Sequence, residues 1–92
     1  MDSYYEGQLI KINDTRPRKF QTSKLQLTNS WGLDKFSSPK FYEVESTDCG
    51  LILKVYDKRT CDELRIDHGI YVLTSKGTQG WISSRYIKGV SK

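Results

Sequence analysis

One stretch near the C-terminal end decides the fold: Lys76-Gly77-Thr78-Gln79-Gly80-Trp81-Ile82-Ser83-Ser84-Arg85-Tyr86-Ile87. Its glycines mark a turn, and the residues after the turn predict a short final strand with aromatic rings at Trp81 and Tyr86. Residues 69–75 precede the turn and predict the strand from which the chain turns into the final one. This end of the chain is therefore predicted to be an antiparallel pair of strands.

Two more strands are predicted just upstream of this pair. Residues 41–46 and 51–57 flank a turn at 47–50, a pattern that is typical of a β-hairpin. Residues 58–68 follow as a charged loop. Because side chains alternate between the two faces of a strand, the pattern places five apolar residues toward the core: Tyr42, Val44, Leu51, Leu53 and Val55.

The N-terminal half carries a weaker strand signal. Residues 7–14 alternate and predict a strand with Ile10 and Ile12 on one face. A basic loop at 15–24 follows, and residues 24–28 alternate again, which predicts a second strand or an edge ribbon. Several short strands separated by turn signals, with almost no helix, favour an antiparallel sandwich or barrel.

The length and composition fit a small barrel. A chain of 92 residues is expected to be one domain, with residues 41–90 as its main part. Six Tyr, three Phe and two Trp supply large side chains for so small a core. We therefore expect an all-β fold, a single barrel of five or six antiparallel strands.

Charge and composition restrict the class of protein. Fifteen Lys and Arg against eleven Asp and Glu give a net charge of +4, which favours anionic partners without proving nucleic-acid binding. No apolar run is long enough to span a membrane, and the polar start of the chain is not a signal peptide, so a cytoplasmic protein is expected. Cys49 and Cys61 do not form the dense pattern of small secreted domains, and free thiols are expected.

Residues 80–87, Gly-Trp-Ile-Ser-Ser-Arg-Tyr-Ile, resemble the closing strand of SH3-like small barrels. Two branches of that group are similar to this chain. Val55-Tyr56-Asp57 and Asp62-Glu63-Leu64-Arg65-Ile66 resemble segments of the SH3 domain itself, with Ser83 where that family has proline. The hairpin at 44–53, followed by residues 69–87, resembles KOW-type and bacterial SH3-like barrels. Small proteins of this build are frequent in bacteriophages, and the resemblance implies function by binding.

The resemblance directs attention to aromatic residues as a protein-binding surface. Loss of the proline and of a tryptophan-bearing strand disfavours proline-rich peptides as the ligand. Tyr56 and Tyr86 would be the remainder of the aromatic shelf, or ordinary half-buried barrel tyrosines. Trp81 either packs in the core or stands exposed, and in the second case it forms a surface with Tyr71 and Arg85. Tyrosine and tryptophan beside arginine have the composition of interface hot spots.

Basic residues offer a second kind of surface. The loop and its neighbours could contact phosphates, and Trp31 could stack on bases; the candidates are Lys11, Arg16, Arg18, Lys19, Lys24 and Trp31. The alternative interpretation is a solvated loop that keeps the protein soluble.

Catalytic chemistry has little support in the sequence. His68 is the only histidine, and it lies without the paired Cys or His spacing that marks a zinc site. A Cys–His pair in space stays open, but nothing selects it. No catalytic residue, metal or cofactor is expected.

The leading hypothesis is a non-catalytic adaptor or inhibitor of phage type that docks on a protein of the host's nucleic-acid machinery. The alternative is direct, sequence-tolerant nucleic-acid binding through the basic loop.

Overall fold

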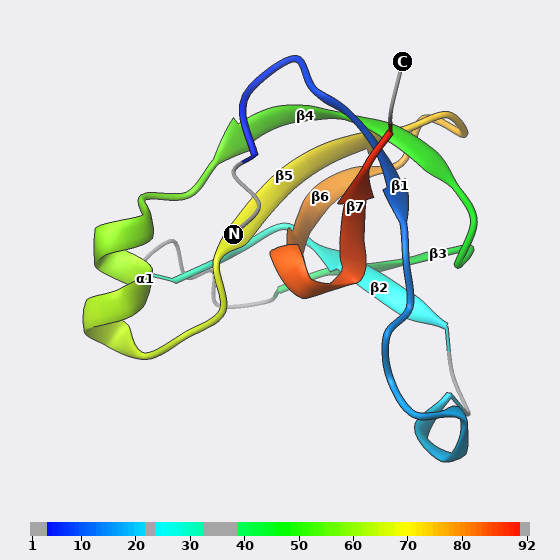
Figure 1. Ribbon diagram of the computed structural model, residues 1–92, viewed down its shortest axis with the longest axis horizontal. Coiled ribbons are helices and arrows are strands. Elements are labelled where there is room, and N and C mark those ends of the chain that lie inside the picture. Colours follow the sequence, from blue (N-terminus) through cyan, green and yellow to red (C-terminus); the bar gives the residue numbers. More distant parts are fainter. Residues whose placement is uncertain (1–3, 22–23, 33–38, 91–92) are drawn as a thin grey trace.

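Strands dominate the computed structural model, which describes residues 4–21, 24–32 and 39–90. Seven strands lie in the described residues: β1 (Leu9–Ile12), β2 (Leu25–Thr28), β3 (Phe41–Val44), β4 (Cys49–Val55), β5 (Gly69–Thr74), β6 (Gln79–Ser83) and β7 (Ile87–Gly89). The helical elements in these described residues are one α-helix and two 3-10 turns: α1 (Lys58–Leu64), η1 (Arg18–Phe20) and η2 (Ser84–Tyr86). Figure 1 shows their arrangement.

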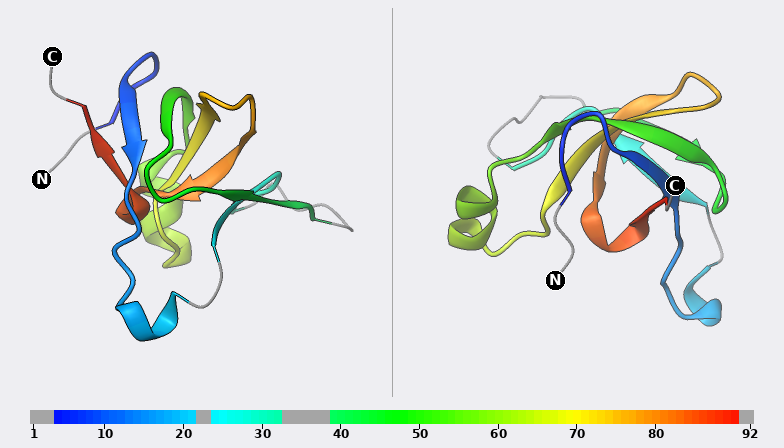
Figure 2. Two further views of the ribbon diagram at one scale, coloured as in Figure 1. Left: turned by 90° about the vertical axis from the view of Figure 1, so that its right-hand side faces the viewer. Right: turned by 45° about the horizontal axis from the view of Figure 1, so that its top comes forward.

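All seven strands belong to one antiparallel sheet. Their order is β3-β2-β6-β5-β4-β1-β7. The sheet curls strongly, as the two views of Figure 2 show, but no pairing between described strands joins β3 to β7. The expectation of a mostly β fold is confirmed. The described sheet has seven strands rather than five or six, and it is not closed.

The stretch that decides the fold forms two strands rather than one. After the turn at Gly77, whose φ of 88° suits glycine, β6 runs only as far as Ser83. The Ser83 hydroxyl then accepts a hydrogen bond from the Arg85 amide and caps η2. This 3-10 turn redirects the chain, and β7 pairs with β1. A serine that can cap a turn is thus the reason that the single predicted strand is wrong.

The N-terminal strand is shorter than predicted, but its inward face is correct. Ile10 and Ile12 are 0% and 1% exposed. β1 ends where the Asp14 carboxylate binds the Arg16 backbone amide and guanidinium, which turns the chain away from the sheet. The basic loop therefore leaves the sheet as an arm that carries η1, at lower right in Figure 1.

The predicted hairpin of residues 41–46 and 51–57 is wrong in its pairing. A turn is present, because the Asp48 amide donates to the Glu45 carbonyl. The chain diverges there, however: β3 pairs with β2, whereas β4 pairs with β1 and β5. Alternation shows which face of a strand is buried but not which strand lies beside it.

The inward face of β4 also differs from the prediction. Ile52 is 1% exposed and lies in the core, while Leu51 and Leu53 are only half-buried. A register shift between Ile52 and Lys54 breaks the alternation, so Val55 packs against the core again. Tyr42, predicted to face inward, is 40% exposed on β3.

A short helix replaces part of the predicted charged loop. The Asp57 carboxylate caps α1 by accepting from the Arg59 amide and the Thr60 hydroxyl. Arg65 ends the helix in the left-handed conformation, with a φ of 57°. Cys61 is the helix residue that is buried.

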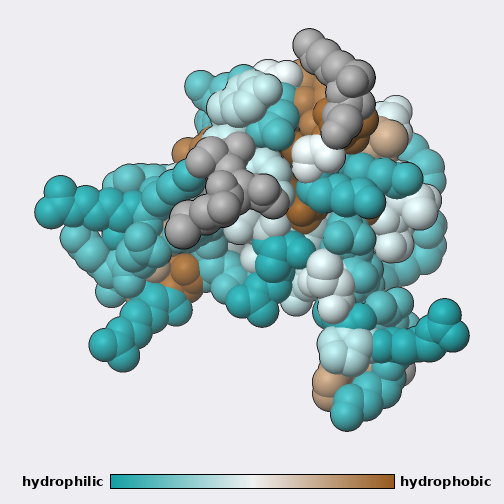
Figure 3. Space-filling model, viewed as in Figure 1, coloured by the Kyte–Doolittle hydropathy of each residue, from teal (hydrophilic) through white to brown (hydrophobic). Residues whose placement is uncertain are grey.

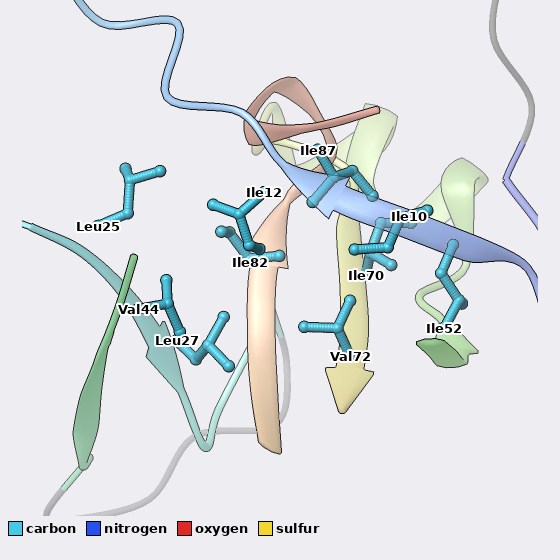
Figure 4. Close-up of a cluster of buried hydrophobic side chains, with 10 residues drawn as sticks. All are labelled: Ile10, Ile12, Leu25, Leu27, Val44, Ile52, Ile70, Val72, Ile82 and Ile87. Atoms are coloured by element: carbon cyan, nitrogen blue, oxygen red, sulfur yellow. The ribbon is translucent and has the colours of Figure 1, made fainter. Parts of the chain in front are cut away.

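The core lies inside the curl of the sheet. Each of the seven strands contributes at least one aliphatic side chain. Figure 4 shows these side chains: Ile10, Ile12, Leu25, Leu27, Val44, Ile52, Ile70, Val72, Ile82 and Ile87. The close approach of β6 to β2 is shown by Gly80, where a Cβ would lie 2.7 Å from Leu27 Cβ.

None of the helices in the described part of the chain is long and apolar enough to cross a membrane.

Candidate protein-binding site

An aromatic cluster lies on the face of β5 and β6 that points away from the core. Because Ile70, Val72 and Ile82 point inward, Tyr71 and Trp81, their sequence neighbours, lie on the opposite face. The Tyr71 and Trp81 rings pack edge to face with centroids 5.2 Å apart.

Tyr56, which follows β4, packs against Trp81 in the same way at 5.6 Å. Trp81 is only 8% exposed, so the structure supports the interpretation in which its ring is packed. The accessible aromatic surface belongs to its neighbours.

Two glycines allow the loop after β2 to cover the end of the cluster. A Cβ on Gly69 would overlap the Trp31 indole, and a Cβ on Gly32 would lie 2.6 Å from the Tyr56 hydroxyl. The Trp31 indole nitrogen donates to the Asp67 carbonyl over 3.0 Å. Trp31 therefore packs on the sheet rather than beside the basic residues with which it was predicted to bind nucleic acid.

A hollow of about 710 Å³ opens beside the cluster. The N-terminal segment forms one wall, because the Tyr4 hydroxyl donates to the Ile87 carbonyl and the Gly7 amide donates to the Ile52 carbonyl. The start of α1 and the end of β4 form the other side. The residues that line the hollow are Tyr4, Tyr5, Glu6, Lys54, Val55, Tyr56, Asp57, Thr60 and Trp81.

The structure brings together three of the five predicted protein-binding residues. Tyr56 and Trp81 line the hollow, and Tyr71 contacts Trp81. Arg85 lies elsewhere and pairs with Asp67 over 3.0 Å. Tyr86 packs half-buried against the core. Because η2 turns the chain, these last two residues do not share a surface with Trp81.

Sequence reasoning missed the contribution of the N-terminal residues. Tyr4 and Tyr5 line the hollow, and Tyr5 is 63% exposed. The signal that could have found them is the pair of adjacent tyrosines just before a predicted strand, since large aromatic side chains are common at interfaces.

Charged groups of both signs surround the hollow. The Thr60 hydroxyl hydrogen bond and the amide bonds at the helix start lower the pKa of Asp57, so its carboxylate is ionised at neutral pH. Glu6 lines the same hollow. The Lys54 ammonium lies 5.9 Å from the Tyr71 ring centroid, on the outer face of β5.

The residues that were predicted to bind nucleic acid lie in several separate parts of the structure. Arg16 forks onto Asp14 with N–O distances of 2.7 and 2.9 Å, and this hydrogen bonding lowers the pKa of Asp14 and raises the pKa of Arg16. Lys24 pairs with Glu45 over 2.6 Å, which raises the pKa of Lys24. Lys11 lies on β1, half-buried, opposite Lys88.

The tip of the arm keeps an exposed basic and aromatic group. Arg18, Lys19 and Phe20 form η1, and the Lys19 ammonium lies 5.1 Å from the centroid of the Phe20 ring. Phe20 is 58% exposed. Figure 3 shows that the arm is hydrophilic over most of its visible surface.

In the described residues, side chains are not assembled into a site for metal or thiol chemistry. Across 4–21, 24–32 and 39–90, no three His, Cys, Asp or Glu side chains gather as they would to hold a metal ion. Cys49 is exposed, Cys61 is buried, and both are free thiols as expected. The His68 ring pairs with Asp62 over 2.8 Å.

No protein-family model, no curated protein and no solved structure matches the chain. The fold and the site define a mostly antiparallel β protein with one short helix and an aromatic hollow at the edge of its outer face.

Proposed function

We propose that this chain is a non-catalytic binding module that docks on a protein partner through the hollow beside Trp81. The observation that carries the proposal is the convergence of Tyr4, Tyr5 and Tyr56 with Trp81 around one opening. Rigid aromatic side chains at the edge of a cavity provide contact area with little loss of conformational entropy, and such residues dominate interface energetics.

The rest of the proposal concerns the family and the partner, and it depends on sequence resemblance. The likeness of residues 80–87 to the closing segment of SH3-like barrels supports an SH3-like fold. The likeness of residues 44–53 and 69–87 to KOW-type barrels supports a phage-type adaptor or inhibitor, with a partner in the host's nucleic-acid machinery.

Selection of peptides from a random display library on the immobilised protein tests the docking function. We expect a convergent set of peptides whose affinity falls about tenfold in Tyr5→Ala, because removal of a hot-spot aromatic typically costs more than 1 kcal/mol. Tyr42→Ala is the matched control, since Tyr42 is an exposed tyrosine that does not line this hollow. Selection of no convergent peptide, or equal losses in the two variants, would overturn the proposal.

The second candidate function is sequence-tolerant nucleic-acid binding by the arm. The observation that favours it is the Lys19 ammonium over the exposed Phe20 ring, beside Arg18. A base could stack on the ring while the cations contact phosphates. Arg16 and Lys24 contribute less, because each is paired with a carboxylate.

Fluorescence anisotropy with labelled single-stranded DNA and RNA tests this second function. Binding that weakens with salt, and that is lost in the double variant Arg18→Ala/Lys19→Ala, would support it. The logarithm of affinity should fall by about 0.7 per phosphate contact for each log unit of salt. Lys76→Ala/Lys88→Ala is the control for net charge. Absence of binding at low salt would exclude this candidate.

A further inference from the structure

We infer that the outer face of β1, β4 and β5 binds an amphipathic helix of a partner protein, one whose apolar stripe is flanked by acidic residues. This surface is separate from the hollow beside Trp81 and goes beyond the proposed docking function. Three features of the face carry the inference: a row of leucines, a pair of lysines beside the row, and the spacing between the two.

A row of leucine side chains crosses the outer face of the sheet. The register pairs Leu9 of β1 with Leu51 of β4, and Leu51 with Leu73 of β5. Each leucine adjoins a residue of the buried core in its own strand, so its side chain points outward. Leu9 is 54% exposed, and the other two are half-buried. Val90 extends the row beyond β1, because its amide donates to the Leu9 carbonyl over 3.1 Å.

This apolar row is unusual for a face that meets water. An antiparallel sheet with one free face normally places polar residues on that face, whereas strands covered on both sides are apolar on both sides. The α-helix of the described residues follows the far end of β4 and does not lie over the row (Figure 1). Apolar surface is visible at the upper right of Figure 3, near the start of β1. The row is therefore suited to contact with another chain.

Two lysines border the row on one side. Lys11 of β1 lies directly opposite Lys88 of β7, and like charges that face each other across strands are destabilising. The ion pairs among the described residues include neither lysine. Asp48, which precedes β4, pairs with Lys76 over 3.4 Å instead. A carboxylate from a partner would relieve the repulsion between the two ammonium groups.

The spacing of the leucines and lysines fits a helix. Neighbouring strands lie about 4.8 Å apart, so the row from Val90 to Leu73 is about 14 Å long. A helix of about 10 residues has this length. Lys11 and Lys88 lie about 7 Å from the row along the strands, which is less than the diameter of a helix, about 10–12 Å. A helix that covers the row with its apolar stripe would thus bring one flank to the lysines.

A protein helix suits this face better than other partners. Recognition of anionic lipids typically uses about four to eight basic residues, whereas two lysines border the row. A nucleic acid would meet the lysines with its phosphates but leave the leucines exposed to water. An extended strand would need free backbone groups, and β1, β4 and β5 are each paired on both sides.

The test is a selection from a display library of peptides about 14 residues long, in which leucines are fixed at helical spacing and the other positions are random. We expect convergence on Glu and Asp along one flank of the leucine stripe. The selected peptide should shift the methyl NMR signals of Leu9, Leu51 and Leu73 and leave those of Leu64 on α1 in place. No convergent peptide, convergence on basic or uncharged flanks, or unchanged Leu9, Leu51 and Leu73 signals would overturn the inference.

A leucine variant tests the apolar row. Leu9→Gln should weaken binding of the selected peptide about tenfold, because loss of a central apolar contact typically has an effect of this size. Leu64→Gln is the matched control, since Leu64 is 43% exposed on α1. Amide NMR spectra verify that both variants are folded. Equal losses in the two variants would contradict the inference.

A lysine variant tests the charges. Lys88→Gln should weaken binding of the same peptide about two- to fivefold, as expected for a partly exposed charge pair. The urea midpoint of the free protein should stay or rise, because the repulsion with Lys11 is relieved. Lys58→Gln, on α1, is the control for net charge. An equal loss of binding in Lys58→Gln, or a fall of the midpoint in Lys88→Gln, would contradict the inference.

Two measurements separate this surface from its alternatives. Tyr5→Ala should leave the affinity for the selected peptide unchanged, because Tyr5 lines the hollow beside Trp81. An equal loss in Tyr5→Ala and Leu9→Gln would overturn the inference of a separate surface. Sedimentation with vesicles of equal parts phosphatidylcholine and phosphatidylserine tests for a membrane. Vesicle binding that is lost in Leu9→Gln, together with no selected peptide, would assign the face to a lipid surface and overturn the inference.

Discussion

The Ser83 hydroxyl donates a hydrogen bond to the Asp67 carboxylate over 2.9 Å. This bond joins the end of β6 to the segment that leads into β5. The same hydroxyl oxygen accepts from the Arg85 amide, and the other Asp67 oxygen accepts from the Arg85 guanidinium. Ser83 is 5% exposed, so water does not replace these contacts readily. The corner at which the chain leaves β6 is thus held by one buried polar group.

Replacing this serine should destabilise the protein. Ser83→Ala removes the cap of η2 and the bond to Asp67, and we expect the free energy of unfolding to fall by about 1–2 kcal/mol. Urea unfolding at pH 7 gives the measurement. Ser75→Ala, in an exposed turn, should change stability by less than about 0.5 kcal/mol. A loss in Ser83→Ala no larger than in Ser75→Ala would show that the corner is not held in this way.

Substitution by alanine should destabilise the protein at Gly80 and at Gly77 for different reasons. Gly80→Ala brings a Cβ to 2.7 Å from Leu27 Cβ and 3.0 Å from the Thr28 carbonyl oxygen, so β2 and β6 must separate. We expect a loss above about 2 kcal/mol, as for overpacked cores.

Gly77→Ala meets no atom within 4 Å but keeps a φ of 88°, and should lose only about 1 kcal/mol. Thermal unfolding of both variants makes the comparison. The reverse order would mean that the close approach of β2 to β6 is relieved by movement of the backbone.

Acid should remove a contribution that Asp14 makes to stability. Its pKa lies below the ordinary value of 3.8 because the Arg16 guanidinium donates to its carboxylate. A group with a lowered pKa in the folded state stabilises the protein above the unfolded pKa, and this stabilisation is lost as the pH falls through the folded pKa.

Asp14→Asn should therefore show a smaller fall in stability between about pH 5 and pH 2 than the parent protein, as measured by the urea midpoint at each pH. Asp62→Asn, whose carboxylate is exposed, is the control. Parallel pH profiles for the parent and Asp14→Asn would contradict this assignment.

The contact between Tyr71 and Trp81 should appear as a coupling energy. A double-mutant cycle with Tyr71→Leu and Trp81→Leu should give about 0.5–1.5 kcal/mol, the range for aromatic pairs beyond their buried area. The cycle that pairs Tyr42→Leu with Trp81→Leu provides the reference and should be additive within about 0.5 kcal/mol. Equal coupling in both cycles would mean that loss of the indole affects the sheet as a whole rather than this ring contact.

Sequence patterns predicted faces better than partners. Ile10, Ile12, Leu25 and Leu27 are buried as alternation requires, because half-buried strands must separate apolar from polar residues. The partner of β4 could not be predicted in this way, since pairing depends on where the chain goes after the turn at 45–48. The helix α1 was also missed, because it is short and only its Cys61 side chain is buried, which leaves no apolar stripe.

The candidate site was predicted in part. Trp81, Tyr56 and Tyr71 were identified because aromatic residues provide most of the large contact area in so small a chain. Arg85 was grouped with these residues because it is close to Trp81 in the sequence. In the structure, η2 turns the chain and separates Arg85 from them. The positive charge available on the basic loop was overestimated, because each basic residue was counted without regard to the acidic residues near it. The Asp14 carboxylate neutralises Arg16.

The two edges of the sheet have different consequences for assembly. On β7, the Ile87 carbonyl faces away from β1 and is bonded to the Tyr4 hydroxyl, while the outer side of β3 pairs with no described strand. Exposed edges are templates for pairing with another chain. Because one outward acceptor of β7 is already bonded, a strand from another chain is expected to add along β3 rather than along β7.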